Sequence, residues 1–210
     1  MDMSAETRGR PPRGSLSQEK ICQAALAVID AEGLPALNMR RLGSELGVDA
    51  MAVYRHLPNK QAILDGVVDL VLADLADGSP AGLSERARTF FTSLRSVLAA
   101  HPNAIPLVAS SALQTGAAKE KASRLLAVFG HSGLSDERAL DAFHTLESFT
   151  FGYAWLEVAG FVGELPESAP FLRRNIPAGA GTGAASPADG GRDERFRRCL
   201  DALLEALLPA

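Results

Sequence analysis

A run of potential hydrogen-bond donors to phosphate lies in the first third of the chain: Tyr54, Arg55, His56 and Lys60. Hydroxyl, guanidinium, imidazole and ammonium groups all donate to the phosphate oxygens of DNA. The residues just before this run are Ala50, Met51 and Ala52, and the two alanines have very small side chains. Alanine permits close approach to base edges and can contact a thymine methyl group. These residue types, in this order, predict a short DNA-reading helix with phosphate donors at its end.

A helix over residues 39–46 is expected just before this run. Asn38 can cap it, because its short side-chain oxygen accepts hydrogen bonds from the free N–H groups of a first helical turn. The apolar residues of this helix share one face, whereas Arg40 and Arg41 lie off that face. The two arginines are therefore expected to flank the DNA contact.

A second helix, over residues 50–56, follows after a tight turn. Gly47 suits the left-handed position at the end of the first helix, and Asp49 can cap the second. Pro58 prevents the second helix from continuing. Two helices separated by about three residues that include a glycine are typical of a helix-turn-helix, whose second helix enters the major groove.

A further helix is expected to begin at Lys60, with Asn59 as its N-cap. The free N–H groups, the positive end of the helix dipole and the Lys60 ammonium can then converge on one phosphate.

Residues 42–65 read LGSELGVDAMAVYRHLPNKQAILD. The run resembles the DNA-binding domain of the tetracycline-repressor (TetR) family of bacterial transcriptional regulators, through its Leu-Gly-Val turn, Tyr-Arg-His triplet and Asn-Lys pair. The resemblance implies an all-α protein, most often a repressor, that a small apolar effector releases from a palindromic operator in double-stranded DNA. The predicted DNA-binding residues are Asn38, Arg40, Arg41, Ala50, Met51, Ala52, Tyr54, Arg55, His56 and Lys60.

Composition is compatible with two domains. The 210 residues are 47% hydrophobic and 22% charged, no apolar run reaches the roughly 18 residues of a membrane span, and the N-terminus lacks a secretory signal. A cytoplasmic protein is expected.

We expect a disordered basic arm over 1–16, a helix-turn-helix domain over 17–60, and a helical effector-binding and dimerisation domain over 61–210.

The formal net charge of −4 argues at first against a nucleic-acid partner. Its distribution resolves the conflict, because residues 1–60 hold 8 basic and 7 acidic residues, whereas 61–210 hold 13 and 18. Positive charge is therefore local, as a DNA-binding module on an acidic body requires. Arg8, Arg10 and Arg13 lie in the N-terminal arm, for which disorder and a contact along the DNA backbone or minor groove are alternative interpretations.

Apolar periodicity predicts further helices over 18–32, 60–77, 84–100, 104–113, 116–130, 135–160 and 193–208. No strand is expected, and the Gly- and Ala-rich residues near 166–192 predict a flexible loop. The helix over 60–77 is apolar around most of its circumference, which suits a connector between two domains. The helices over 135–160 and 193–208 are expected to form a four-helix homodimer interface, although they can instead close a monomeric core.

An effector site is expected among the aromatic residues of the C-terminal region, with a few polar groups to orient the ligand. The candidate residues are Phe90, Gln114, Phe143, His144, Glu147, Phe151 and Trp155. Core packing is the alternative role for the aromatic residues, and a solvated hydrogen-bonded pair is the alternative for His144 and Glu147. In tetracycline repressors, a histidine seven residues after the position of His101 binds the drug's magnesium. Val108 occupies that position here, so tetracycline–Mg²⁺ is not expected to bind in that manner.

Catalytic motifs are lacking: there is no two-histidine zinc-protease helix, no nucleophile elbow and no phosphate-binding glycine loop after a strand. We expect no enzyme activity, no cofactor and no metal. The competing interpretation is a ligand-sequestering or enzymatic helical protein with a vestigial helix-turn-helix.

Cys22 and Cys199 are expected to be core residues in a reducing compartment, with a redox or disulfide role as the alternative.

Overall fold

The computed structural model describes residues 16–76, 82–111, 116–159 and 190–208, and all regular elements within these ranges are helical. In chain order they are α1 (Gln18–Glu32), the 3₁₀ helix η1 (Leu34–Ala36), α2 (Met39–Leu46), α3 (Ala50–Tyr54), α4 (Lys60–Val71), α5 (Leu83–Ala100), the 3₁₀ helix η2 (Pro102–Ala104), α6 (Ile105–Ser111), α7 (Gly116–Gly130), α8 (Asp136–Val158) and α10 (Gly190–Leu207). The all-α prediction is confirmed. None of these helices is both long and apolar enough to cross a membrane.

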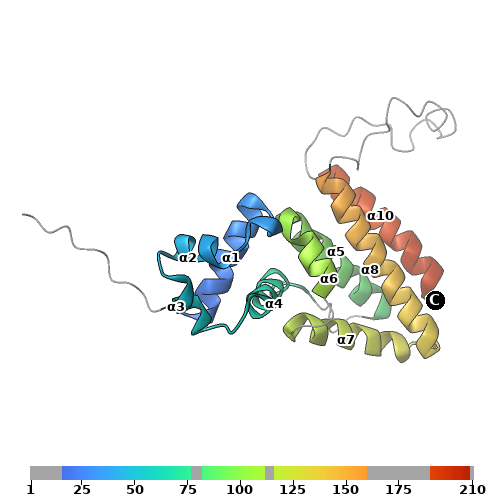
Figure 1. Ribbon diagram of the computed structural model, residues 1–210. Helices are drawn as coiled ribbons and strands as arrows, with labels where there is room; N and C mark the ends of the chain where they lie inside the picture. Colours follow the sequence, from blue (N-terminus) through green and yellow to red (C-terminus); the bar gives the residue numbers. More distant parts are fainter. Residues whose placement is uncertain (1–15, 77–81, 112–115, 160–189, 209–210) are drawn as a thin grey trace, which may run out of the picture.

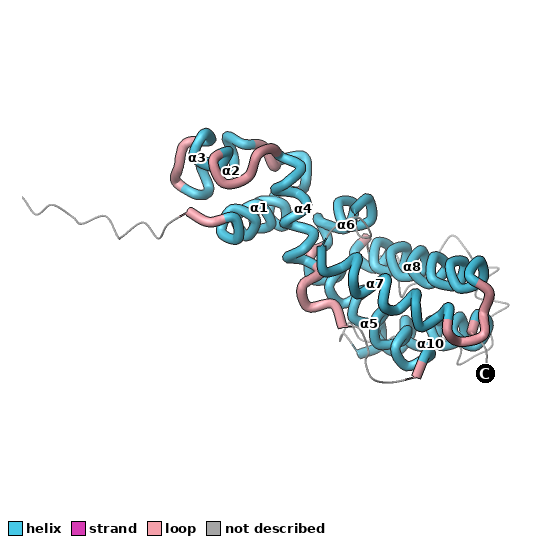
Figure 2. Tube along the Cα trace, turned by 90° about the horizontal axis from the view of Figure 1, so that it is seen from below, coloured by secondary structure: helices cyan, strands magenta, loops and turns pink. Residues whose placement is uncertain are grey.

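The helices form two groups joined by α4. Helices α1 to α4 gather at one end of the molecule, and α5, α6, α7, α8 and α10 pack together at the other (Figure 1). Seen from below, α6 and α7 lie next to α4 (Figure 2), and both contact it. The two groups are therefore packed together in two places: α4 lies against α6 and α7, and α1 lies against η2.

Helix α1 is the brace of the N-terminal group. Its apolar residues Ile21, Ala25 and Ile29 are fully buried, and α1 packs against both α2 and α4. Leu37, just before α2, is also buried. This core lies behind the short helices α2 and α3 and leaves their outer faces in solvent.

The predicted helix over 60–77 is too long, because α4 ends at Val71. Tighter turns follow, in which the Leu75 N–H donates to the Leu72 carbonyl at 3.2 Å and Ala76 N–H donates to Ser93 Oγ at 2.9 Å. Leaving the helix lets both Leu72 and Leu75 enter the core. The burial of these two leucines and the hydrogen bond to Ser93 of α5 stabilise this ending more than further helical hydrogen bonds would.

An aromatic cluster forms the core of the second group. Phe90 and Phe91 of α5, Phe129 of α7 and Phe143 of α8 have ring centroids 5.2 to 6.4 Å apart, in tilted or edge-on pairs. Aromatic rings favour such offset and edge-on arrangements over face-to-face contact. The cluster fixes α5, α7 and α8 relative to one another.

Two further predictions need correction. Helix α10 begins at Gly190, inside the predicted loop near 166–192, while residues 160–189 and the arm over 1–15 lie outside the described residues. Cys199 is exposed, although Cys22 is buried as expected. Phe196, Leu200 and Leu204 make the buried seam of α10, and Cys199 lies beside that seam.

Candidate nucleic-acid interface

Each helix of the helix-turn-helix begins at a side-chain cap. Asn38 Oδ1 accepts from the Arg41 N–H at 2.9 Å, Asp49 Oδ1 from the Met51 N–H at 2.8 Å, and Asn59 Oδ1 from the Ala62 N–H at 2.8 Å. All three caps have extended backbones. Such caps satisfy N–H groups that have no partner within the helix, so they define where α2, α3 and α4 start.

The turn between α2 and α3 depends on two glycines. Gly47 has φ 64°, the left-handed conformation predicted for it, and its N–H donates to the Gly43 and Ser44 carbonyls. A Cβ on Gly43 would lie 2.9 Å from the Val48 carbonyl oxygen. Sequence reasoning missed Gly43, although a glycine inside a helix is itself a signal, since it costs about 1 kcal/mol relative to alanine.

Helix α3 presents Met51 and Tyr54 to solvent. Val53 is fully buried and anchors the helix, whereas Met51 is 69% exposed and Tyr54 is 41% exposed. Ala50 and Ala52 are half-buried. The helix ends at Tyr54, so Arg55 and His56 lie in the following turn instead of within the predicted helix over 50–56. Both remain exposed, just past the end of α3.

A hydrogen bond from α1 supports this end of α3. Gln18 Nε2 donates to the His56 carbonyl oxygen at 2.9 Å. Nothing in the spacing of the sequence indicates this contact, because the two residues are 38 positions apart. It adds a polar link to the apolar brace that α1 provides.

The flanking cations are held in different ways. Arg40 is exposed, but Arg41 makes hydrogen-bonded ion pairs with Glu32 at 2.7 Å and with Glu45 at 2.8 Å. Hydrogen bonds to Glu32 and then Glu45 raise the pKa of Arg41. Lys60 Nζ donates to the Leu37 carbonyl oxygen at 2.6 Å. An ammonium has three donors, so this bond leaves Lys60 able to donate to a phosphate.

The residues predicted to bind an effector differ in their burial. Phe90 and Phe143 fill the aromatic core, Phe151 is half-buried, and Trp155 is 52% exposed on α8. His144 is exposed, and its Nδ1 lies 3.1 Å from Glu147 Oε2. Gln114 lies outside the described residues. The assignment of the described members to an effector site therefore stays a prediction.

Comparisons with known proteins agree with this geometry. Residues 21–67 match the family described as "Bacterial regulatory proteins, tetR family", and residues 78–207 match "Tetracyclin repressor-like, C-terminal domain". The HTH-type transcriptional repressor DrrR1 of Streptomyces coeruleorubidus is 30% identical over 164 residues, which cover 73% of this chain and 59% of DrrR1. The match therefore spans less than two thirds of that relative.

Solved structures are similar over nearly the whole chain. The crystal structure of apo ActR from Streptomyces coelicolor has a TM-score of 0.69 and 27% sequence identity, covering 93% of this chain and 96% of ActR. The complex of ActR with actinorhodin has a TM-score of 0.70 and 26% identity, with coverages of 92% and 97%.

Proposed function

The chain belongs to the tetracycline-repressor (TetR) family of bacterial regulatory proteins, and from this premise we propose that it is a transcriptional repressor that binds a palindromic operator through α3. The observation that carries the proposal is the position of α3, anchored by buried Val53 with its other side in solvent. A helix held in this way suits insertion into a major groove. The protein acts by binding and not by catalysis, in the cytoplasm, where bacterial DNA lies.

Base reading and phosphate binding fall to different residues. Ala50, Met51 and Ala52 lie on the short helix that would face base edges, where small and apolar side chains can contact thymine methyl groups. Tyr54, Arg55, His56 and Lys60 hold phosphates, with Asn38 and Arg40 at the flank. Arg41 has to exchange an ion pair with Glu32 or Glu45 to reach DNA, so its contribution is the smallest of the cations.

A gel-shift assay with DNA that flanks the gene tests the function. A repressor is expected to shift one fragment specifically in the presence of excess competitor DNA, and a palindrome within that fragment is expected to be protected from cleavage. No specific shift with any flanking fragment would contradict the proposal.

Lys60→Ala is expected to weaken binding to all DNA sequences. The Lys60 ammonium would neutralise one phosphate, so the slope of log K against log salt is expected to fall in magnitude by about one unit. Binding measured over a range of salt concentrations gives this slope. Lys119→Ala, at an exposed position of α7, is the matched control and should keep the wild-type slope. An unchanged slope in the Lys60 variant would contradict a phosphate contact.

The protein is a homodimer, because one short helix reads too few base pairs. Two DNA-binding domains, one from each protomer, are needed to bind the two half-sites of a palindrome. Large apolar side chains along α8 support this assembly, since Leu140, Trp155, Leu156 and Val158 are 43 to 52% exposed. Helices α8 and α10 lie side by side and would pair with the same helices of a second copy (Figure 1).

Trp155→Glu is expected to shift this dimer toward monomer, because a charge would be buried against the second copy. Sedimentation equilibrium at several concentrations measures the shift. Ala127→Glu, at an exposed position of α7, is the control and should sediment as the wild type does. A wild-type protein that remains a monomer at every concentration would refute the assembly.

Effector binding in the C-terminal group is transmitted to α1 and α4. The Asp30 carboxylate at the end of α1 lies 2.9 Å from His101 Nδ1, and the Asp30 carbonyl accepts from Asn103 Nδ2 at 2.9 Å. Lys121 Nζ of α7 donates to the Ala73 carbonyl, just past α4, at 2.7 Å. An effector that favours another arrangement of α6 and α7 would therefore change the distance between the two DNA-binding domains of the dimer. The ActR complex with actinorhodin supports a small-molecule effector of this kind.

Tetracycline with Mg²⁺ is not expected to be that effector. Val108 in α6 is fully buried, and an isopropyl group cannot ligate a metal in place of an imidazole. Titration of the protein with tetracycline, followed by drug fluorescence with and without Mg²⁺, should show no saturable metal-dependent binding. A tetracycline repressor serves as the positive control. Saturable binding that requires Mg²⁺ would show that another residue replaces the missing ligand.

A further inference from the structure

Met51 is the most exposed of the large apolar side chains in the described part of the chain, with 69% of its surface in solvent. Single exposed apolar residues are common on protein surfaces and by themselves indicate no ligand. Met51 differs because it lies on α3, the five-residue helix that the proposed function places against base edges. An apolar side chain at this position has to contact a particular group of the DNA.

The backbone of α3 directs Met51 away from the protein. Residues two apart on an α-helix are separated by about 200° around its axis, so Met51 lies nearly opposite the fully buried Val53. The Asp49 carboxylate accepts from the Met51 N–H at 2.8 Å, which fixes the backbone at this residue. Ala50 and Ala52, the neighbours of Met51, are half-buried. Met51 therefore lies at the centre of the outward face of α3.

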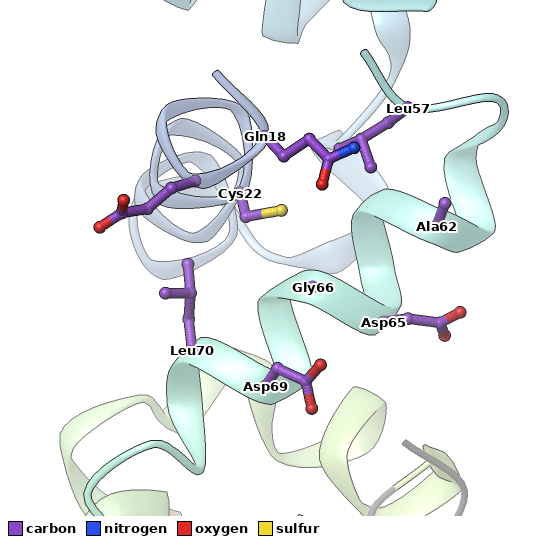
Figure 3. Close-up of a pocket in the computed structure, with 9 residues that line it drawn as sticks. Gln18, Cys22, Leu57, Ala62, Asp65, Gly66, Asp69 and Leu70 are labelled. Atoms are coloured by element: carbon purple, nitrogen blue, oxygen red, sulfur yellow. The ribbon is translucent and has the colours of Figure 1, made fainter. Parts of the chain in front are cut away.

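The other end of α3 is held by α1. Gln18 Nε2 donates to the His56 carbonyl oxygen at 2.9 Å, and the Gln18 side chain extends from α1 toward Leu57 (Figure 3). Leu57 is buried and anchors the chain just past the helix. The Asp49 cap at one end and the Gln18 hydrogen bond at the other therefore fix the direction in which Met51 projects.

The central residues of the outward face offer no strong hydrogen bond to a base edge. Ala50 and Ala52 have no polar atom in their side chains, and the Met51 thioether is at most a weak acceptor. Most of the features that distinguish bases in the major groove are donors and acceptors, which these side chains do not match. The exception is the 5-methyl group of thymine, which is apolar. A flexible, polarisable methionine suits contact with a methyl group.

The polar residues that follow Met51 do not supply this discrimination in the proposed function. Tyr54, Arg55 and His56 are exposed and are assigned to phosphates. Phosphate contacts position a protein on the duplex but carry no direct sequence information. Base preference at the centre of α3 therefore depends on apolar contact.

On the basis of the proposed operator binding through α3, we propose that Met51 is a specificity-determining residue that reads the 5-methyl group of one pyrimidine in each half-site. Thymine carries this methyl group, and 5-methylcytosine carries it at the same ring position. Uracil and cytosine lack it. The protein therefore distinguishes pyrimidines at this position by their methyl group and not by their hydrogen bonds, so methylation of a cytosine placed there raises operator affinity.

Replacement of thymine by uracil in the operator removes only the methyl group, so it tests this contact directly. One pair of thymines, at equivalent positions of the two half-sites, is replaced at a time, and affinity is measured by gel shift. At the pair that contacts Met51, affinity is expected to fall about fourfold for each methyl group and about 15-fold for the pair, as for burial of one CH₂ group in each half-site. At the same pair, 5-methylcytosine is expected to bind more tightly than cytosine by a similar factor.

Met51→Gln tests the residue, because glutamine has a similar length and helix propensity without the apolar end. Met51 is exposed, so the fold should be kept, and circular dichroism checks this. The variant should bind the thymine and uracil operators within about twofold of each other, the scatter expected when no interaction remains. Met51→Leu keeps an apolar side chain and should keep the preference. Ser44→Ala, at an exposed position of α2, is the control and should show the wild-type ratio.

Three results would overturn the methyl contact. They are uracil at every thymine pair leaving affinity unchanged, 5-methylcytosine binding no better than cytosine, and Met51→Gln keeping the wild-type ratio. Each of these requires a specific complex with the unmodified operator, so the repressor function would still stand. Absence of any specific complex would instead overturn the repressor function and the methyl contact together.

Discussion

Replacement of Arg95 by alanine is expected to lower the free energy of unfolding by about 3 kcal/mol or more, because it leaves buried charge without its partner. Arg95 is 4% exposed in the centre of α5. Its Nε and Nη2 atoms donate to the two carboxylate oxygens of Glu157 on α8 at 2.9 and 2.7 Å. Its Nη1 donates to Asp193 on α10 at 2.6 Å.

The guanidinium also lies against aromatic rings, 5.7 Å from the Tyr153 centroid and 5.2 Å from that of Phe196. Burial lowers the pKa of Arg95, but the hydrogen bonds to Glu157 and Asp193 more than compensate, and the pKa is raised overall. Arg95 therefore stays charged and joins α5, α8 and α10. Loss of this junction is also expected to weaken the dimer, since α8 and α10 are the proposed interface helices.

Urea unfolding at fixed protomer concentration measures the effect. Arg198→Ala, which removes an exposed ion pair with Glu194, is the control and should change stability little. Arg95→Met combined with Glu157→Leu should recover much of the loss, because a well-packed apolar pair can replace a buried ion pair. An Arg95→Ala protein as stable as the wild type would mean that water or another cation compensates Glu157.

Gly43→Val is expected to weaken operator binding by about tenfold or more, which corresponds to 1.4 kcal/mol. A Cβ at this position would lie 2.9 Å from the Val48 carbonyl oxygen and 3.4 Å from the Ala50 nitrogen. These are backbone atoms of the turn, so the turn itself has to move. Because Ala50 begins α3, the displacement changes the position of the reading helix directly, and overpacking adds a cost of about 1 to 3 kcal/mol in stability.

Gel-shift titration with the operator fragment, together with a thermal melt, separates the two effects. Ser44→Val is the matched control, because it adds a β-branched side chain to the same helix at an exposed neighbouring position. It should keep operator affinity close to that of the wild type. A Gly43→Val protein that binds with wild-type affinity would show that the turn can widen without moving α3.

Local rules were sufficient for the parts of the molecule that depend on neighbouring residues. The three caps Asn38, Asp49 and Asn59 and the left-handed Gly47 are where the sequence predicts them. Caps and turns involve hydrogen bonds over two to four residues, so their chemistry is visible in short stretches of sequence. For the same reason the family resemblance in residues 42–65 was readable without a structure.

Charge pairing was not predictable in this way. Arg41 was expected at the DNA surface, but it bridges Glu45 on its own helix and Glu32 on α1. Lys60 was expected beside a phosphate, and it also holds the Leu37 carbonyl. Long flexible side chains reach whichever partner the fold brings near, and spacing along the chain does not identify that partner.

The amino-acid order alone predicted the all-helical chain, its cap residues and the two short helices of the helix-turn-helix, because these follow from periodicity and local hydrogen bonding. Tertiary packing decided the end of α4 at Val71, the exposure of Cys199 and the outward position of Trp155. It also brought Arg95 together with Glu157, 62 positions later, and with Asp193, 98 positions later. Such contacts depend on which helix faces meet, and that is set by the packing of the whole core.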